Sequence, residues 1–475
     1  MKNKWLVLIA VALGFFLVNF DGSAISILLP TLQSDFATRF DLIQWVTLAG
    51  LLTLVVMLAI AGRLGDSIGK KLIFITGTGI YLAGSLLIAI APTIHMVIGM
   101  RVVQALGLTT FLALGAAIVT EVFEENRRGF ALGMYNLLGL FGILAGPVAA
   151  GALLETASWR VVFWIAAGIS ILVFILAIIF LPKTISRNQV TLDLKGAFAL
   201  LVGLSALLLA LTFAQTQSFF SFIVLGLFLL SFFGLAVFVW IEKRTVDPII
   251  TIDSFKNPVF SLNLLFLLLS MIALSGYGFL MPFYLQNMLG LSTMQMGLIL
   301  ATIFGLVMAV TAPIGGAISD KVGSTKVTCI GISLLLVGTI ASIWLDENST
   351  QLSVFLRFLP VGMGIGLVIT PTTSAVMGTL PKDRLGMGAS LTSIIINLAQ
   401  TMGIAILGTF WSGSVHAALG GLPVGGASMA PIPVQVDALQ STFIFAGCII
   451  FFGLVLNLWR VFVENRQSKS VGVMQ

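Results

Sequence analysis

Charged residues are scarce in this sequence: Asp, Glu, Lys and Arg together make up 9% of its 475 residues. Soluble globular proteins carry about 25% charged residues, so this scarcity excludes a water-soluble protein. Hydrophobic residues instead make up 59% of the chain. Because a membrane-spanning helix needs about 20 mostly apolar residues, the chain is long enough for many such helices and has no room for a large soluble domain.

Cysteine and histidine are also rare. The two cysteines, Cys329 and Cys448, and the two histidines, His95 and His416, lie far apart in the sequence, so their spacing supports neither a disulfide framework nor a metal site. No constellation of Ser, His and acid indicates an enzyme, and we expect no catalytic activity and no cofactor. The net charge of +6 does not indicate a nucleic-acid partner, because the basic residues do not cluster.

Fourteen apolar segments, bounded by charged residues or by clusters of Pro and Gly, predict fourteen membrane-spanning helices. The expected spans are 5–29, 42–61, 72–91, 96–120, 129–154, 160–181, 194–214, 219–240, 259–286, 293–318, 326–345, 351–379, 385–411 and 439–462. The first apolar run continues through Asp21 to Leu29 without a cleavage pattern, so we interpret it as a retained span and not as a signal peptide. Lys and Arg concentrate in alternate connections, which predicts that both chain termini are cytoplasmic.

The sequence contains an internal repeat. Gly62–Gly69, after the second span, resembles Gly316–Gly323 after the tenth, and Arg101 and Arg357 are displaced by nearly the same number of residues. A fixed displacement indicates repeated structural units, and a site between repeated bundles is typical of transporters. We therefore predict an all-α membrane protein with two six-helix bundles and two inserted helices. The expected domains are 1–186 for the N-terminal bundle, 187–250 for the inserted helices and 251–475 for the C-terminal bundle, with an extracytoplasmic loop at 412–440.

Four motifs carry a resemblance to a known family. They are Gly62-Arg-Leu-Gly-Asp66-Ser-Ile-Gly69-Lys70-Lys after the second span, Arg101-Val-Val-Gln104-Ala-Leu-Gly107 in the fourth, Gly142-Ile-Leu-Ala-Gly146-Pro147-Val-Ala-Ala-Gly151 in the fifth, and Asp21 with Pro30 in the first. On these motifs, and over nearly the whole chain, the sequence resembles the major facilitator superfamily and, within it, the fourteen-helix drug:proton antiporters. It departs from the family pattern at Ser23 and Ala24, where a Thr is common, and at Ala317, where the second gate motif lacks its Arg.

The resemblance implies a major facilitator fold and an exchange of protons for small molecules. It assigns proton coupling to Asp21 and Arg101. The gating motifs that it implies contain Gly62, Arg63, Asp66, Gly69, Lys70, Gly142, Gly146 and Pro147 in the first half, with Asp320 and Arg357 as counterparts in the second half.

Asp21 is the one carboxylate that the expected spans place within the hydrocarbon region. Burying an acid at a helix centre costs about 2.5 to 3.5 kcal/mol, so a partner must offset this cost. Asp21 lies about 13 Å from Pro30 along the helix axis, and Arg101 lies a few residues into the fourth span from the same side. The two side chains are therefore expected to meet, either as a proton switch or as a static ion pair that locks two helices together.

The second half offers Ser275, Gly276 and Tyr277 where Asp21 lies in the first half. Because no acid stands there, we expect proton coupling in the first half alone. Arg357 then either takes part in gating or binds a backbone carbonyl or extends outward.

The gate motif and the fifth span each allow two interpretations. Asp66 can bridge the bundles or bind Arg127 or Arg128 as a latch, or it can cap the following helix in a tight turn. Gly142 and Gly146 permit close helix packing, and Pro147 bends the helix. This small-residue surface either seals the bundle interface against proton leak or serves packing alone.

Polar residues in the spans are candidates for a central substrate cavity. They are Gln104, Tyr135 and Asn136 in the first half and Tyr277, Tyr284, Asn397 and Gln400 in the second. Each could equally serve an interhelical hydrogen bond. The segment 412–440 is rich in Gly and Pro and is either an outer lid or a disordered connector.

Together these patterns predict a monomeric transporter in a bacterial cytoplasmic membrane, with a small-molecule substrate, protons and the lipid bilayer as its partners. We expect it to export lipophilic cations in exchange for protons by alternating access. Two alternatives remain open: export or symport of a specific metabolite or lipid, and a membrane sensor that transports nothing. The Gly146-Pro147 motif argues against uptake, and a sensor would be expected to carry a soluble domain.

Overall fold

The computed structural model describes residues 3–182, 193–214, 217, 220–245, 255–378 and 385–472. These residues form helices and connections without any β-strand. Fourteen helices are long and apolar enough to cross a bilayer, which confirms the predicted number of spans. The expected domain boundaries near residues 186 and 250 lie outside the described residues.

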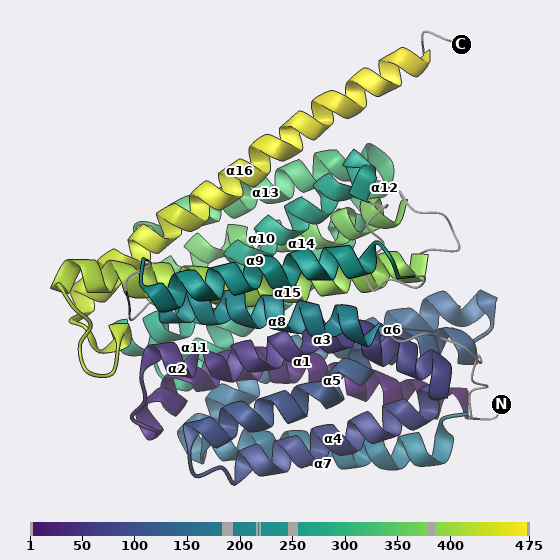
Figure 1. Cartoon of the computed structure of the whole chain (residues 1–475), viewed down its shortest axis with the longest axis horizontal. Coiled ribbons are helices and arrows are strands. Elements are labelled where there is room, and N and C mark those ends of the chain that lie inside the picture. Colours follow the sequence, from purple (N-terminus) through teal and green to yellow (C-terminus); the bar gives the residue numbers. More distant parts are fainter. Residues whose placement is uncertain are drawn as a thin grey trace. The chain divides into compact units, whose positions relative to one another are not determined.

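The chain divides into two compact units (Figure 1). The first consists of Met1–Ile250, Leu285–Ala301 and Val424–Ser428, so it includes the inserted helices and two short segments from later in the sequence. Its helices are α1 (Lys4–Asp35), α2 (Phe40–Ile43), α3 (Trp45–Ile68), α4 (Lys70–Ala89), α5 (Ile94–Val122), α6 (Glu125–Thr156), α7 (Trp159–Phe180), α8 (Leu194–Phe213), α9 (Phe222–Glu242) and α11 (Thr293–Leu300).

In the first unit α1 packs against α5, α6 and α7, and α4 packs between α5 and α7 (Figure 1). Glycines bring α4 and α5 into backbone contact: a Cβ at Gly107 would lie 2.5 Å from the carbonyl oxygen of Gly77, and one at Gly84 would lie 2.7 Å from the backbone nitrogen of Gln104. Small residues allow such close approach of helices in a membrane. This contact fixes the part of α5 that carries Arg101 and Gln104.

The second unit consists of Thr251–Tyr284, Thr302–Pro423 and Met429–Gln475. Its helices are α10 (Pro258–Phe283), α12 (Met308–Val322), α13 (Ser324–Ser342), α14 (Gln351–Gly378), α15 (Leu385–Leu419) and α16 (Ile432–Gly472). Two π-helical segments, Tyr284–Met288 and Ala301–Val307, adjoin α10 and α12, and the chain passes between the two units inside these segments. Insertions of this kind interrupt the regular hydrogen-bond ladder of a helix.

The gate motif is helical, contrary to the expected loop. Helix α3 continues to Ile68 and α4 begins at Lys70, so Gly69 is the only residue between them. Gly69 has a φ of 115° and ends α3, and Gly323 ends α12 in the same way with a φ of 94°. The charged residues of the motif do not break the helix; the turn requires only the positive φ that glycine adopts readily.

The connection expected at 412–440 is shorter in the structure. Helix α15 extends to Leu419 and α16 begins at Ile432. The residues between them include a 3-10 helix at Ala427–Met429, and Gly420, Gly425 and Gly426 have positive φ values. Gly and Pro do not exclude a helix at every position. Pro433 is compatible with the first turn of α16, because its missing N–H would be unpaired there in any case.

Candidate proton-coupling site

Asp21 and Arg101 form a buried ion pair in the first unit. Arg101 Nη1 donates to Asp21 Oδ1 at 2.9 Å and to Oδ2 at 2.7 Å, and each side chain is 5% exposed. Asp21 lies in the middle of α1, and Arg101 lies two turns into α5. The α1–α5 contact therefore brings together two residues that are 80 positions apart in the sequence.

Arg101 is held by groups other than Asp21 as well. Its Nε donates to the carbonyl oxygen of Val46 on α3 at 3.0 Å, and its Nη1 donates to Gln104 Oε1. Gln104 Nε2 in turn donates to Ser85 Oγ on α4 at 2.9 Å. A buried charge is tolerated only when it is paired and hydrogen-bonded, and this network from three helices meets that condition.

Two features of the sequence make room for the network. Arg101 and Gln104 are three residues apart, so they lie on the same face of α5. A Cβ at Gly50 on α3 would lie 3.2 Å from Arg101 Nη2, so the glycine leaves space for the guanidinium. The spacing of Arg101 and Gln104 is visible in the sequence, but nothing in the sequence identifies Gly50, Ser85 or the Val46 carbonyl as part of the site.

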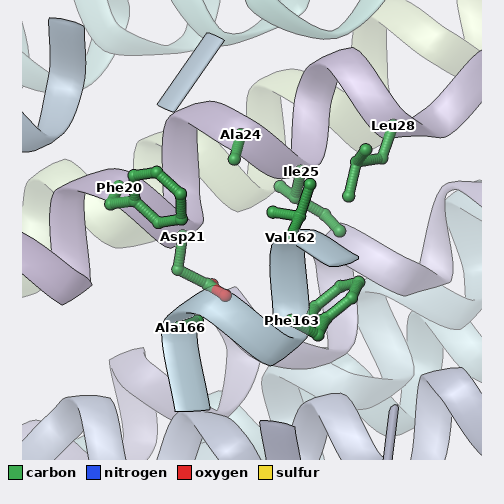
Figure 2. Close-up of a pocket in the computed structure, with 8 residues that line it drawn as sticks. All are labelled: Phe20, Asp21, Ala24, Ile25, Leu28, Val162, Phe163 and Ala166. Atoms are coloured by element: carbon green, nitrogen blue, oxygen red, sulfur yellow. The ribbon is translucent and has the colours of Figure 1, made fainter. Parts of the chain in front are cut away.

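The other side of the Asp21 carboxylate faces α7. Figure 2 shows the carboxylate directed toward Ala166, next to a small cavity between α1 and α7. The cavity has a volume of about 10 Å³ and is lined by Phe20, Asp21, Ala24, Ile25, Leu28, Val162, Phe163 and Ala166. A single water needs about this much space. Asp21 thus lies between an arginine on the α5 side and a cavity the size of one water on the α7 side.

Helix α6 packs closely on the segment of α1 that carries Asp21. A Cβ at Gly142 would lie 2.5 Å from the Phe16 carbonyl oxygen, and one at Gly146 would lie 2.1 Å from Ser23 Oγ. Ser23 Oγ also donates to the Gly142 carbonyl oxygen at 3.3 Å. The small residues of α6 therefore support the position of Asp21.

The opposite part of the α6 surface contacts α11. A Cβ at Gly297 would lie 2.3 Å from the Pro147 carbonyl oxygen, and Thr293 Oγ1 donates to the Gly151 carbonyl oxygen at 2.9 Å. The Gly142–Gly151 motif thus packs two different helices of the first unit, which fits both interpretations given for it above.

The gate motif forms a local ion-pair cluster. Asp66 Oδ1 lies 3.4 Å from Lys70 Nζ, and Lys70 also pairs with Glu121 at the end of α5. Arg128, one of the partners expected for Asp66, donates from Nε to the Phe123 carbonyl oxygen at 3.0 Å. The N-cap residue of α4 is Gly69, which has no side chain to cap the helix, so both interpretations of Asp66 stay predictions. Arg63 and Gly62 are partly exposed on the same part of α3.

The second unit has an aromatic cluster where the first unit has its ion pair. The Tyr277 ring lies 5.1 Å from that of Phe443 and 5.7 Å from that of Phe358, measured between ring centroids, and no Asp or Glu occurs in α10. Arg357 binds the Trp344 carbonyl oxygen. This contact matches the backbone-carbonyl alternative for Arg357. Asp320 is exposed in the last turn of α12.

Several residues expected to face a cavity lie inside their own unit. Gln104 and Tyr284 are fully buried, Tyr135 and Tyr277 are nearly so, and the Tyr135 ring stacks on Phe15 at 4.5 Å. Tyr284 Oη donates to the Asp346 carbonyl oxygen at 2.7 Å. This placement agrees with the alternative of contacts between helices that the sequence left open for these four residues.

The three other candidates remain accessible. Asn136 is exposed on α6, while Asn397 and Gln400 are partly buried on α15. Asn397 Nδ2 donates to the Ser393 carbonyl oxygen of its own helix at 2.8 Å, so its amide is already engaged locally.

Fourteen helices able to span a bilayer and a buried acid–arginine pair are features expected of a membrane transporter. The sequence model of the Major Facilitator Superfamily matches residues 11–404 and 264–473, and the chain belongs to this superfamily. Its fold and family are those of transporters and not of enzymes, as predicted.

Relatives with curated names include transporters of two kinds. The riboflavin transporter RibZ of Clostridioides difficile is 29% identical over 99% of this chain and 100% of its own length. The multidrug resistance protein Stp of Mycobacterium tuberculosis is 26% identical over 88% of this chain and 78% of its own length. A bacterial homologue of the human lysosomal transporter Spinster has a similar structure, with a TM-score of 0.69 at 14% identity, covering 97% of this chain and 98% of that structure.

Proposed function

We propose that this transporter exports lipophilic, positively charged small molecules in exchange for protons, by alternating access in a bacterial cytoplasmic membrane. The observation that carries the proposal is the buried Asp21–Arg101 pair. Ionisable groups buried within a membrane mark proton or substrate pathways by default, and this pair is the one buried ion pair between side chains of the described residues.

The pair is suited to binding and releasing a proton. A proton on Asp21 would remove the attraction between the two side chains, while Arg101 would keep its bonds to Val46 and Gln104. Protonation would therefore loosen α1 from α5 without leaving the guanidinium unpaired. In the predicted orientation, α1 runs from the cytoplasmic side at Lys4 to the outer side at Asp35, so a proton from outside would reach Asp21 along the second half of α1.

The number of buried carboxylates bears on stoichiometry. Among the described residues, the buried acids are Asp21 and Glu242, and Glu242 is the last residue of α9, at the end of its span. With a single acid in the middle of a span, we infer that one proton exchanges for one monovalent cation. Such an exchange moves no net charge, so transport in vesicles would continue when only the electrical potential is dissipated.

Transport of one metabolite is the second candidate, and a specific observation favours it. The relative named a riboflavin transporter matches this chain over its whole length, whereas the multidrug relative Stp matches over 88% of the chain. Riboflavin is an uncharged, planar molecule, so its transport would not depend on a cation-binding surface.

One experiment separates these functions. The wild-type protein and Asp21→Asn are expressed in a pump-deficient bacterial host and tested with dyes, quaternary ammonium compounds, antibiotics and radiolabelled riboflavin. Asp437→Asn is the matched control, because Asp437 is exposed outside the site. Proton-driven efflux that is lost in Asp21→Asn and retained in the control is the expected result.

Each other outcome has a definite meaning. Unchanged efflux in Asp21→Asn would remove this residue from the mechanism. Riboflavin transport without resistance to any of the other compounds would favour the metabolite transporter. Absence of any transport by correctly inserted protein would favour the membrane sensor.

We also propose that the gate motif latches the bundles. The cluster of Asp66, Lys70 and Glu121 supplies the charges for such a latch. Reversal of the charge in Asp66→Lys should reduce transport, with protein abundance measured as the control. Full transport in Asp66→Lys would show that the motif serves only as a turn.

A further inference from the structure

The groups around the Asp21 carboxylate limit the path by which a proton can reach it. Arg101 and Gln104 occupy the α5 side of Asp21. Tyr81, on α4, is close enough to interact with its charge. Helix α3 contributes the Val46 carbonyl, and α6 contributes Gly142 and Gly146 beside the same segment of α1.

The α7 side of the carboxylate is lined by residues whose side chains neither donate nor accept a proton. The cavity lining there consists of Val162, Phe163 and Ala166 from α7, and Figure 2 shows these side chains across from α1. The small side chains of Ala24 and Ala166 leave the space open next to the acid. An ordered water needs two to four polar partners, and Asp21 is the one polar residue in this lining, so the cavity leaves space for a water to pass and does not bind one.

Apart from Phe20, the α1 residues that line the cavity lie between Asp21 and the Asp35 end. The lining reaches Leu28, about 10 Å toward the Asp35 end at 1.5 Å per residue. The remaining distance from Leu28 to Asp35 is about the same. The cavity itself has room for about one water, and the α1 residues that line it come from the half of this segment nearer to Asp21.

Aromatic rings fill the space between α1 and α7 toward the Asp35 end of α1. Phe163 packs against Trp159 at 6.0 Å and Trp159 against Phe36 at 5.7 Å, measured between ring centroids. Trp159 is 1% exposed, and its Nε1 donates to Oδ2 of the exposed Asp35 at 2.9 Å. Arg160 lies over the Trp159 ring at 4.3 Å. Charged groups thus lie at the Asp35 end of the α1–α7 seam, aromatic rings follow, and the small cavity lies beside Asp21.

We propose that this α1–α7 seam is the proton-access path to Asp21, with Phe163 and Trp159 as its hydrophobic closure. The proposal rests on the function proposed above, in which Asp21 carries the proton. A hydronium ion in the cavity transfers its proton to an Asp21 oxygen: one O–H bond breaks, one forms, and a neutral water remains. The proton approaches from the α7 side, so Arg101 does not have to leave its position first.

The test follows the exchange of the Asp21 proton directly and needs no transported substrate. Purified protein is acidified and transferred to D₂O, and infrared difference spectra record the carbonyl stretching band that is present in the wild type and missing in Asp21→Asn. Ala166→Leu fills the cavity and should slow deuteration of this band by about tenfold or more, a barrier increase of about 1.4 kcal/mol. Phe163→Ala removes the closure and should accelerate it by a similar factor.

Gly168→Leu is the matched control, because Gly168 is exposed on the same helix and a Cβ added there would meet no atom within 4 Å. It should leave the exchange rate unchanged. If Ala166→Leu fails to fold, Phe163→Ala still tests the path with the opposite sign. An Asp21 band whose exchange rate is the same in every variant would overturn the seam while leaving proton coupling intact. Absence of any band that depends on Asp21 would overturn both proposals.

Discussion

The strength of the Asp21–Arg101 interaction can be measured by removing each partner in turn. The closest atoms are 2.7 Å apart and both side chains are 5% exposed, so at an effective dielectric constant of about 20 the attraction is about 6 kcal/mol. Desolvation of the two charges offsets much of this attraction. Loss of one partner of a buried pair typically costs about 3 to 5 kcal/mol, because it leaves the other charge uncompensated.

The two single variants should differ from each other. In Arg101→Gln, Asp21 loses the cation that donates to both of its oxygens, so we expect destabilisation of about 3 to 5 kcal/mol. In Asp21→Asn, Arg101 keeps the Val46 and Gln104 oxygens, and the loss should lie at the lower end of this range. The double variant contains neither charge and should be more stable than Arg101→Gln alone.

The assay is unfolding of the purified protein in detergent, followed by the fluorescence of its eight tryptophans. The four proteins form a double-mutant cycle, which isolates the pairwise contribution. We expect a coupling of at least about 2 kcal/mol. If the single effects add to within about 0.5 kcal/mol, the two charges do not stabilise each other, and the physical basis of the proton switch is refuted.

Three further predictions concern other contacts of the first unit. Gly146→Ala should destabilise the protein by about 1 to 3 kcal/mol, because the new methyl group overpacks α6 against α1, whereas Gly133→Ala, which points into open space, should be neutral or stabilising in the same unfolding assay. Gln33→Ala removes the side chain that donates hydrogen bonds to oxygens of the segment Val424–Ser428, and each lost bond should cost about 1 kcal/mol. Hydrogen exchange of this segment should therefore become faster. An unchanged exchange rate would show that other contacts hold the segment. The salt bridge from Lys4 lowers the pKa of Glu124. The pair therefore stabilises the folded protein above the ordinary pKa of a glutamate, and this stability is lost as the pH falls through the lowered pKa. Lys4→Gln should abolish this pH-dependent stability, and high salt should reduce it in the wild type.

The number and position of the spans followed from the sequence alone. Exclusion of charge from long apolar runs is a local property, because each spanning helix must bury its own backbone polar groups in lipid. The repeat that relates Arg101 to Arg357 is likewise visible without coordinates. Even the meeting of Asp21 with Arg101 could be anticipated, since few groups in a membrane can offset a buried acid.

The directions of the other polar side chains were decided by the tertiary structure. Gln104 and Tyr135 are buried in contacts between helices of the first unit, although their residue types are equally suited to a cavity wall. The ends of α3 and α15 were also mispredicted where charge or glycine suggested a connection. These helices continue to the residue before Gly69 and Gly420, whose positive φ values end them.

Composition determined that this chain lies in a membrane as fourteen helices, because the hydrophobic effect acts on each segment separately. Packing decided what surrounds Asp21: Arg101 and the Val46 carbonyl on one side and Ala166 with its small cavity on the other. Asp21 and these groups come from four helices, and close packing brings them together only after each helix has formed.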